Sequence, residues 1–200
     1  MNTFKFFFED VIGKYKTTDE VMYAILTNLD SALYQPGEAI IKRQAKVDEL
    51  ILIQQGHCHL YGYSKDKSSG MEQKVNFINL PRYSWYGDFQ ILLNLNSTFQ
   101  MEAAGCNRSN NGKTKDEAYN AKHNFVQVYR LSAKFLHNIC QQYPNFKRFL
   151  LLRATERRSR FHKVFEELIQ TKSLLEKYLQ RIEANDMLNH LEANDEEEVK

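Results

Sequence analysis

The most informative stretch of the sequence is Ser84-Trp85-Tyr86-Gly87-Asp88-Phe89-Gln90-Ile91-Leu92-Leu93-Asn94. In this stretch two aromatic residues lead into a glycine, an acid and an apolar run with helical spacing. Glycine lets a backbone come close to a ligand, and the free amides at a helix start can hold a phosphate. The Asp88 carboxylate is also suited to accept a hydrogen bond from a sugar hydroxyl. A buried structural turn before a short helix fits the same pattern. This stretch alone therefore does not distinguish a ligand-binding turn from a buried one.

Short strand-like runs flank this stretch on both sides, with turn residues such as Pro36-Gly37 and Gly56 between them. The runs cover residues 39–41, 49–55, 57–63, 73–80, 98–104 and 125–131. Short strands at close spacing predict a β sandwich or barrel. Helical spacing predicts one helix over 17–29, a second after the N-cap Ser132, and a long third one that opens at Pro144. The polar segment 105–124 is predicted to be an exposed loop.

The composition is that of an ordinary globular domain. The chain has 200 residues, 42% of them apolar, and 27 basic residues against 25 acidic ones give a net charge of +2. This balance offers no bulk-charge argument for binding nucleic acid, and no apolar run is long enough to span a membrane. Cys58, Cys106 and Cys140 are odd in number and far apart, which is typical of free thiols in a reducing compartment. Composition therefore predicts a soluble intracellular domain.

Motifs for catalysis and metal binding are weak. On a strand, His57-Cys58-His59 would place both histidines on one face and the cysteine on the other, and no second cluster completes a zinc site. The segment from Gly105 to Gly112-Lys113-Thr114 resembles a phosphate-binding loop, but Asn107 stands where its first glycine is required. We therefore expect no enzyme activity, no catalytic residue and no bound metal.

A basic cluster lies at the start of the long helix, within residues 146–163, where Glu156 is the single acid. Its members are Lys147, Arg148, Arg153, Arg157, Arg158, Arg160 and Lys163. Two interpretations stay open. The cluster could bind an anionic partner such as a phosphate, an acidic lipid or an acidic protein face. It could equally be a solvated helix face, with the acidic residues near the C-terminus as internal partners.

Three motifs in order resemble the cyclic nucleotide-binding domain family. The segment Tyr34-Gln35-Pro36-Gly37-Glu38-Ala39-Ile40-Ile41 is similar to the family's opening signature, and residues 48–56 are similar to its second one. Tyr86-Gly87-Asp88 lies where the family's phosphate-binding cassette begins. The resemblance covers residues 20–164, and residues 84–88 and 153–161 look most like the C-terminal cytosolic region of cyclic-nucleotide-gated or voltage-gated potassium channels, especially ciliate ones.

This resemblance implies an α+β fold, a β jelly-roll barrel (a double-stranded β-helix) flanked by an N-terminal helix and a long C-terminal helix. It divides the chain into a helical linker (1–29), a barrel (30–138), lid helices (139–185) and an acidic tail (186–200). A cyclic AMP or cyclic GMP ligand would lie in the barrel against the cassette, under the lid. The implied site residues are Gly87, Asp88, Phe89, Ser97 and Thr98 in the cassette and Arg157, Arg158 and Phe161 on the lid helix.

The chain departs from the family pattern at the ligand-contacting positions. Asp88 falls at the position of the acid that takes the ribose hydroxyls, and it is one methylene shorter than the usual glutamate. Ser97 falls at the position of the arginine that pairs with the cyclic phosphate, and a hydroxyl cannot neutralise that charge. Gln44 stands where the family turns on a glycine, so it has to adopt that turn without glycine's conformational freedom. These departures predict weak or absent nucleotide binding.

The resemblance therefore implies a regulatory domain of a potassium or other cation channel, at the cytosolic face of a membrane. Such a domain couples ligand, or the position of the lid helix, to gating. Its partners would be an optional cyclic nucleotide and neighbouring channel subunits in a homo-oligomer such as a tetramer, with no nucleic acid. Membrane attachment would come only through a channel portion outside this sequence. The alternative is a ligand-free structural or protein-interaction module that keeps the same fold.

Overall fold

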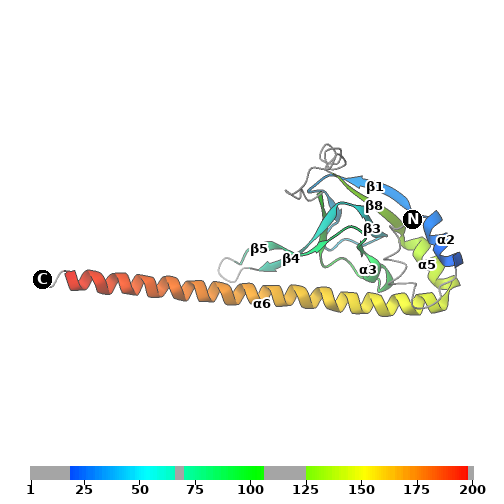
Figure 1. Ribbon diagram of the computed structural model, residues 1–200. Coiled ribbons are helices and arrows are strands. Elements are labelled where there is room, and N and C mark those ends of the chain that lie inside the picture. Colours follow the sequence, from blue (N-terminus) through cyan, green and yellow to red (C-terminus); the bar gives the residue numbers. More distant parts are fainter. Residues whose placement is uncertain (1–18, 66–69, 106–124, 198–200) are drawn as a thin grey trace. The chain divides into compact units, whose positions relative to one another are not determined.

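Two four-stranded antiparallel sheets face each other in the computed structural model, which describes residues 19–65, 70–105 and 125–197 (Figure 1). One sheet has the order β1-β8-β3-β6 and the other has the order β2-β7-β4-β5. The strands are β1 (Asp30–Tyr34), β2 (Ala39–Ile41), β3 (Glu49–Gln55), β4 (His57–Lys65), β5 (Glu72–Leu80), β6 (Trp85–Tyr86), β7 (Gln100–Gly105) and β8 (Val126–Ser132). Strands that are distant in sequence are neighbours in both sheets, which is the jelly-roll arrangement.

The strand sequences alternate between core and surface. In β4, Cys58 and Leu60 are fully buried, whereas His57 and His59 lie half-buried on the opposite face. This period-two pattern confirms the prediction that the two histidines share a face which the cysteine does not. Cys58 and Cys140 are both free, and burial raises the pKa of Cys58 to about 12 and that of Cys140 to about 11.

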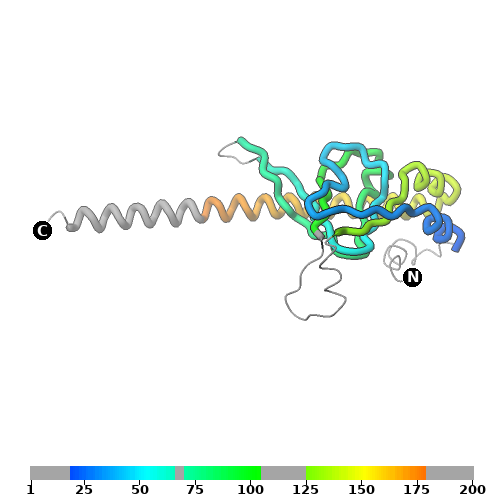
Figure 2. Tube along the Cα trace, turned by 90° about the horizontal axis from the view of Figure 1, so that it is seen from above, coloured from blue at the N-terminus to red at the C-terminus, as the bar shows by residue number. Residues whose placement is uncertain are grey.

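Four helices lie in the described residues: α2 (Asp19–Thr27), α3 (Asp88–Leu92), α5 (Ala133–Gln142) and α6 (Pro144–Glu197). The hydroxyl of Ser132 accepts a hydrogen bond from the Phe135 amide at 3.2 Å, so Ser132 is the predicted N-cap. Pro144 opens α6, as predicted. Figures 1 and 2 both show α2 beside α5, and the Tyr143 hydroxyl, just after α5, donates to Glu20 of α2 at 3.5 Å. The predicted linker helix therefore docks on the helix that follows the barrel.

The jelly-roll fold class is confirmed, and strands β2 and β3 have the bounds that the sequence predicts. Strands β1 and β6 were missed. β1 is an edge strand with little buried surface, and β6 is two residues long and exists because Trp85 and Tyr86 pair with β3. Gly105 ends β7 instead of opening the predicted loop, and the rest of that loop lies outside the described residues.

The chain divides into two compact units, up to residue 160 and from residue 161 onward. The boundary falls within α6, which is helical through Glu197 and so includes most of the predicted acidic tail. None of the helices in the described ranges combines the length and the apolar character that a membrane crossing requires.

Gln44 occupies the turn between β2 and β3 in a left-handed conformation, with φ of 61°. Its amide donates to the Ser97 carbonyl at 2.6 Å, and the Ser97 amide donates to the Ala45 carbonyl at 2.9 Å. The turn is therefore held on both sides although it lacks glycine. This confirms the prediction that Gln44 adopts a turn which favours glycine.

Substituting Gln44→Gly is expected to raise the free energy of unfolding by about 1 kcal/mol, because a side chain at positive φ costs about that much and glycine does not. Urea denaturation would measure the change. The matched control is Arg148→Gly, at an exposed interior position of α6, which should instead lower stability by about 1 kcal/mol. Equal destabilisation by both variants would contradict the prediction.

Candidate functional site

The candidate site begins at Gly87, between β6 and α3. Gly87 is the N-cap of α3 and has φ of 107°, a conformation that side chains rarely adopt. A Cβ atom at this position would lie 2.8 Å from the Glu49 carbonyl oxygen and 3.2 Å from Val47 Cγ1. The close approach that the glycine permits is thus to the chain's own β3. The backbone turn is buried, as one of the two interpretations of this stretch requires.

Asp88, the first residue of α3, is held by an arginine from α6. The Arg157 Nη1 atom lies 2.7 Å from Asp88 Oδ1, and the two side chains are 16% and 7% exposed. The contact is an ion pair without the alignment of a hydrogen bond. Arg157 Nη2 also donates to the Trp85 carbonyl at 2.6 Å, and its guanidinium lies 4.5 Å from the centre of the Trp85 ring. One arginine thus contacts β6 and α3 together.

This ion pair is largely out of water. A desolvated carboxylate is unfavourable unless a counter-charge and hydrogen bonds compensate it. Arg157 supplies the counter-charge for Asp88, and the Trp85 carbonyl and ring hold the guanidinium in place. For Asp88 to accept a hydrogen bond from a sugar hydroxyl, it would have to weaken this contact.

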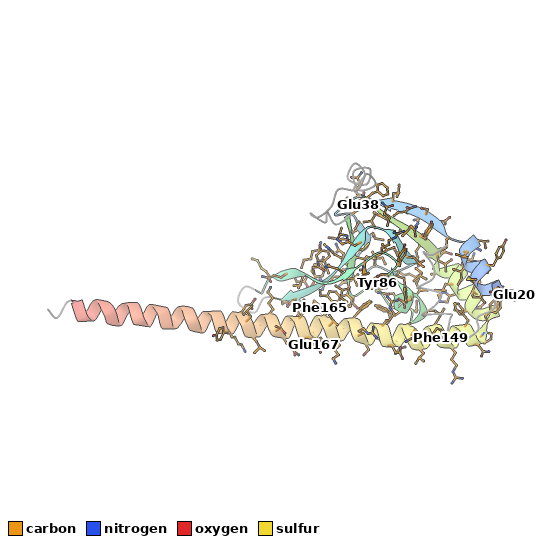
Figure 3. All side chains as sticks on the ribbon, in the orientation of Figure 1. Glu20, Glu38, Tyr86, Phe149, Phe165 and Glu167 are labelled. Carbon is orange, nitrogen blue, oxygen red and sulfur yellow. The ribbon has the colours of Figure 1, made fainter. Side chains whose placement is uncertain are left out.

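Ser97 is buried at 1% exposure, and its hydroxyl is used inside the protein. It donates to the Phe99 carbonyl at 2.6 Å and lies 3.5 Å from the Tyr86 hydroxyl. Burial raises the pKa of Tyr86 well above its usual value. Gln90 is also 1% exposed, and its amide lies near the Tyr86 hydroxyl without an aligned hydrogen bond. These three residues, Tyr86, Gln90 and Ser97, form a buried polar cluster, and Figure 3 shows Tyr86 among the interior side chains.

The other predicted site residues are spread over several environments. Phe89 is buried, and its ring meets the Tyr86 ring edge to face at 5.6 Å. Thr98 and Arg158 are exposed, and Phe161 is 7% exposed and begins the second unit. The structure therefore brings Gly87, Asp88, Phe89 and Ser97 together with Arg157.

The basic cluster of α6 separates into two groups. Arg153 and Arg157 are half-buried, and Arg153 pairs with Glu156 at 3.1 Å while Arg157 pairs with Asp88. The exposed members are Lys147, Arg148, Arg158, Arg160 and Lys163. The internal partner of Arg157 is therefore a cassette acid, which neither interpretation from the sequence had identified. Trp85 was also missed as a contact of the lid helix, because no local pattern links residues so far apart in the chain.

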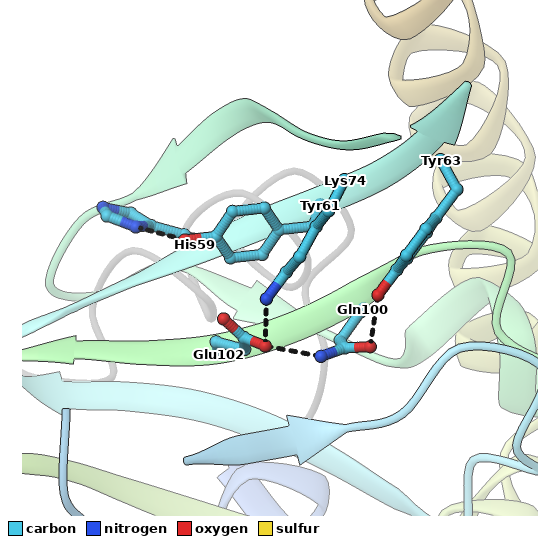
Figure 4. Close-up of polar contacts among 6 residues, drawn as sticks. All are labelled: His59, Tyr61, Tyr63, Lys74, Gln100 and Glu102. Atoms are coloured by element: carbon cyan, nitrogen blue, oxygen red, sulfur yellow. Dashed lines mark hydrogen bonds and ion pairs between the residues drawn. The ribbon is translucent and has the colours of Figure 1, made fainter. Parts of the chain in front are cut away.

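A second polar cluster lies on one face of β4, β5 and β7 (Figure 4). The Tyr63 hydroxyl donates to Gln100 at 2.9 Å, and Glu102 accepts from both Gln100 and Lys74. Next to it, His59 Nδ1 lies 3.2 Å from the Tyr61 hydroxyl. Burial and the neighbouring His57 lower the pKa of His59. The Tyr63–Gln100 and Lys74–Glu102 contacts join different strands and stabilise the sheet, whereas the Gln100–Glu102 contact lies within β7 and the His59–Tyr61 contact within β4. In the described ranges, no three histidine, cysteine or acidic side chains gather into a metal site.

Comparison with solved structures bears on the fold. The catabolite activator protein of Thermus thermophilus superposes with a TM-score of 0.53 at 15% identity, over 78% of this chain and 62% of that one. The regulatory domain of Toxoplasma gondii PKA, crystallised with cAMP, superposes with a TM-score of 0.52 at 10% identity, over 76% of this chain and 49% of that one. The chain has the fold of a cyclic nucleotide-binding domain.

No protein-family model matches the chain, and neither does any curated protein. The chain spans less than two thirds of the length of either similar structure. At this level of identity the likeness shows the cyclic nucleotide-binding fold alone. What the site can bind therefore depends on the chemistry of Asp88, Ser97 and Arg157.

Proposed function

We propose that this chain is a cyclic nucleotide-binding-like regulatory domain that binds cyclic nucleotide weakly or not at all. The observation that carries the proposal is the buried ion pair between Asp88 and Arg157. At the position of the ribose-binding acid, the carboxylate already has an internal cation. At the position of the phosphate-binding arginine, Ser97 gives its hydroxyl proton to a backbone carbonyl. Neither position offers a free charged group to a nucleotide.

The proposal extends to the role of α6. Because Arg157 links α6 to both β6 and α3, the start of this helix is held against the cassette by the chain's own residues. In a ligand-gated relative, nucleotide would favour such a closed arrangement by binding it more tightly. In this chain the ion pair between Asp88 and Arg157 stabilises the closed arrangement in place of a nucleotide. The domain would then act as an assembly and gating element whose state changes when the pair breaks.

We place this domain in a potassium or other cation channel, at the cytosolic face of a membrane, because residues 84–88 and 153–161 resemble channel tails. The docking of α2 on α5 supports this placement, since a helical linker that packs on the barrel's helices can pass on their movement. The complete transcript would test it. Six membrane spans and a pore motif upstream are expected, and an intact reading frame without them would contradict the channel role.

Titration with cyclic AMP and cyclic GMP tests the binding proposal. For the wild-type chain we expect no heat of binding, and almost no change in thermal stability, up to millimolar nucleotide, because a ligand stabilises only when its concentration exceeds its dissociation constant. Saturation in the micromolar range would contradict the proposal.

A second measurement tests whether Arg157 competes with nucleotide. Arg157→Met releases Asp88, so binding of a fluorescent cyclic nucleotide should tighten relative to wild type. Arg160→Met removes the same charge from an exposed position of the same helix that is not an implied site residue, and it should leave the affinity unchanged. Chemical denaturation of each variant confirms that it is folded before the titration.

A further inference from the structure

A cavity of about 640 Å³ lies between α3, the connection from β2 to β3 and the start of α5. Its lining residues fall within 46–48 of the connection, 90–96 of α3 and the loop after it, and 132–137 at the start of α5. Binding pockets for small molecules usually have volumes of about 300 to 1,000 Å³. We call this space the α3–α5 cavity, and its size is that of a small-molecule site.

The start of α5 makes the α3–α5 cavity electropositive. The first turn of this helix holds Lys134 and no acidic residue. A helix start is the positive end of the helix dipole, so a lysine there is unfavourable for the helix itself and favourable for a bound anion. No described residue forms an ion pair with the Lys134 ammonium group. Its charge is therefore available to a ligand.

A second ammonium group lines the α3–α5 cavity from the connection between β2 and β3. Lys46 lies 3.1 Å from Asp48, and both side chains are largely exposed. Such an exposed ion pair contributes little to stability, so little is lost when Lys46 turns toward a ligand. Two lysines from different elements match a phosphate monoester, whose charge at neutral pH is about −1.5 to −2. A carboxylate has only one charge for the two lysines.

A buried amide also lines the α3–α5 cavity. Gln90 is 1% exposed, and neither its side-chain oxygen nor its nitrogen has an aligned hydrogen bond with the described residues. Buried amides nearly always have hydrogen-bond partners, and leaving one unpaired is destabilising. Because an amide both donates and accepts, ligand hydroxyl groups can satisfy both atoms of Gln90. The unpaired amide therefore indicates a ligand whose body is polar.

His137 adds a further hydrogen-bonding group to the α3–α5 cavity. Its Nδ1 atom lies 2.7 Å from the Ala133 carbonyl oxygen, which can only accept, so Nδ1 carries the proton of the neutral ring. Nε2 is then an acceptor that suits a ligand hydroxyl. Elsewhere in the lining, the buried side chains of Val47 and Ile91 supply apolar surface. Hydroxyl groups next to C–H surface are the chemistry of a sugar.

We propose that the α3–α5 cavity binds a sugar phosphate. Lys134 and the start of α5 hold the phosphate, with Lys46 as the second counter-charge, and Gln90 and His137 hold the sugar hydroxyls. The inference does not rest on the proposed regulatory function, because neither residue of the buried ion pair lines the cavity.

Calorimetric titration of the full chain with glucose 6-phosphate, ribose 5-phosphate and AMP tests the ligand class. At least one of them is expected to saturate at submillimolar concentration and to raise the thermal midpoint. The neutral parents glucose, ribose and adenosine should bind at least about 10-fold more weakly, because they lack the charge-assisted contacts. No saturation by any of the three phosphates at millimolar concentration would overturn the proposal.

Two further probes test the parts of the ligand separately. Inorganic phosphate carries the charge without the sugar, and it should bind more weakly than the best ester. Equal binding would reduce the site to one for an adventitious ion only. Glucuronate carries a carboxylate on a sugar, and tighter binding of glucuronate than of all three esters would overturn the phosphate assignment.

Lys134→Met tests where the phosphate lies. It should weaken binding of the ester by about 10-fold or more and leave the binding of its neutral parent unchanged. The matched control is Lys147→Met, which removes an exposed lysine from the first turn of α6, outside the cavity, and should not change the affinity. Both positions are exposed, so both variants should fold, which circular dichroism verifies. Equal losses would place the ligand on the basic cluster of α6 and overturn the site.

Gln90→Met separates binding from stability. Replacing an unpaired buried amide by an apolar chain of similar length should keep or raise the free energy of unfolding without ligand, whereas binding of the ester should weaken several-fold. Reduced stability with unchanged affinity would overturn the role of Gln90 in the site.

The imidazole resonances of His137 locate the ligand directly. They should shift during titration with the ester, whereas those of His57, on β4, should stay in place. A shift at His57 without one at His137 would place the ligand outside the α3–α5 cavity and overturn the proposal.

Discussion

Arg157→Met is expected to lower the free energy of unfolding by about 3 kcal/mol, because it leaves the Asp88 carboxylate buried without its counter-charge. Asp88 is only 7% exposed, so water cannot replace the guanidinium without opening the site. Asp88→Asn should lower the free energy of unfolding less in the Arg157→Met variant than in the wild-type protein. Urea denaturation of the two single variants and the double variant gives this coupling directly.

The control for this cycle is an exposed ion pair of similar length. Lys46 and Asp48 lie 3.1 Å apart with side chains that are 72% and 66% exposed. Lys46→Met should change stability by less than about 0.5 kcal/mol, because an exposed pair is screened by water. Equal losses in the free energy of unfolding for Lys46→Met and Arg157→Met would mean that the ion pair of Asp88 and Arg157 is not desolvated. That result would also contradict the proposed function.

Gly87→Ala is expected to destabilise the fold by about 3 kcal/mol or more, from two additive causes. The backbone at φ of 107° strains any side chain, and the new Cβ would lie 2.8 Å from the Glu49 carbonyl oxygen. The carbonyl belongs to β3 in the centre of a sheet, so it cannot move aside cheaply. The midpoint of chemical denaturation measures the loss.

Gly37→Ala separates the two causes, because Gly37 also has a positive φ, of 89°, but a Cβ there meets nothing within 4 Å. Backbone strain alone should lower the free energy of unfolding of the Gly37→Ala variant by about 1 kcal/mol. Equal losses at the two positions would mean that the contact with β3 does not contribute, and that the cassette can shift away from the sheet.

Local sequence patterns predicted most of the fold. The alternation in residues 57–63, the turn at Pro36-Gly37 and the N-cap Ser132 each act within a few residues, and each is found in the structure. β1 and β6 escaped prediction for a physical reason. Their strand conformation comes from pairing with β8 and β3, and their own sequences carry little of the signal.

The candidate site was predicted only in part. The sequence, through its family resemblance, placed Asp88 and Ser97 at ligand-contacting positions and Arg157 on the lid helix, and their roles in binding stay predictions. No pattern indicated that Arg157 contacts Asp88 and Trp85, or that the Ser97 hydroxyl points to a backbone carbonyl. These contacts join residues that only the folded chain brings together.

From its local patterns the sequence predicts a β sandwich or barrel with flanking helices, because strand alternation, turn residues and helix caps are local properties, and the jelly-roll topology is what its family resemblance implies. The sequence also determined that Ser97 cannot neutralise a phosphate, since that follows from the side chain alone. That Asp88 has an arginine partner within its own chain follows from the folded arrangement and from no local pattern. A buried carboxylate needs a counter-charge, and which of the seven cations in the basic cluster of α6 supplies it depends on where the helix packs.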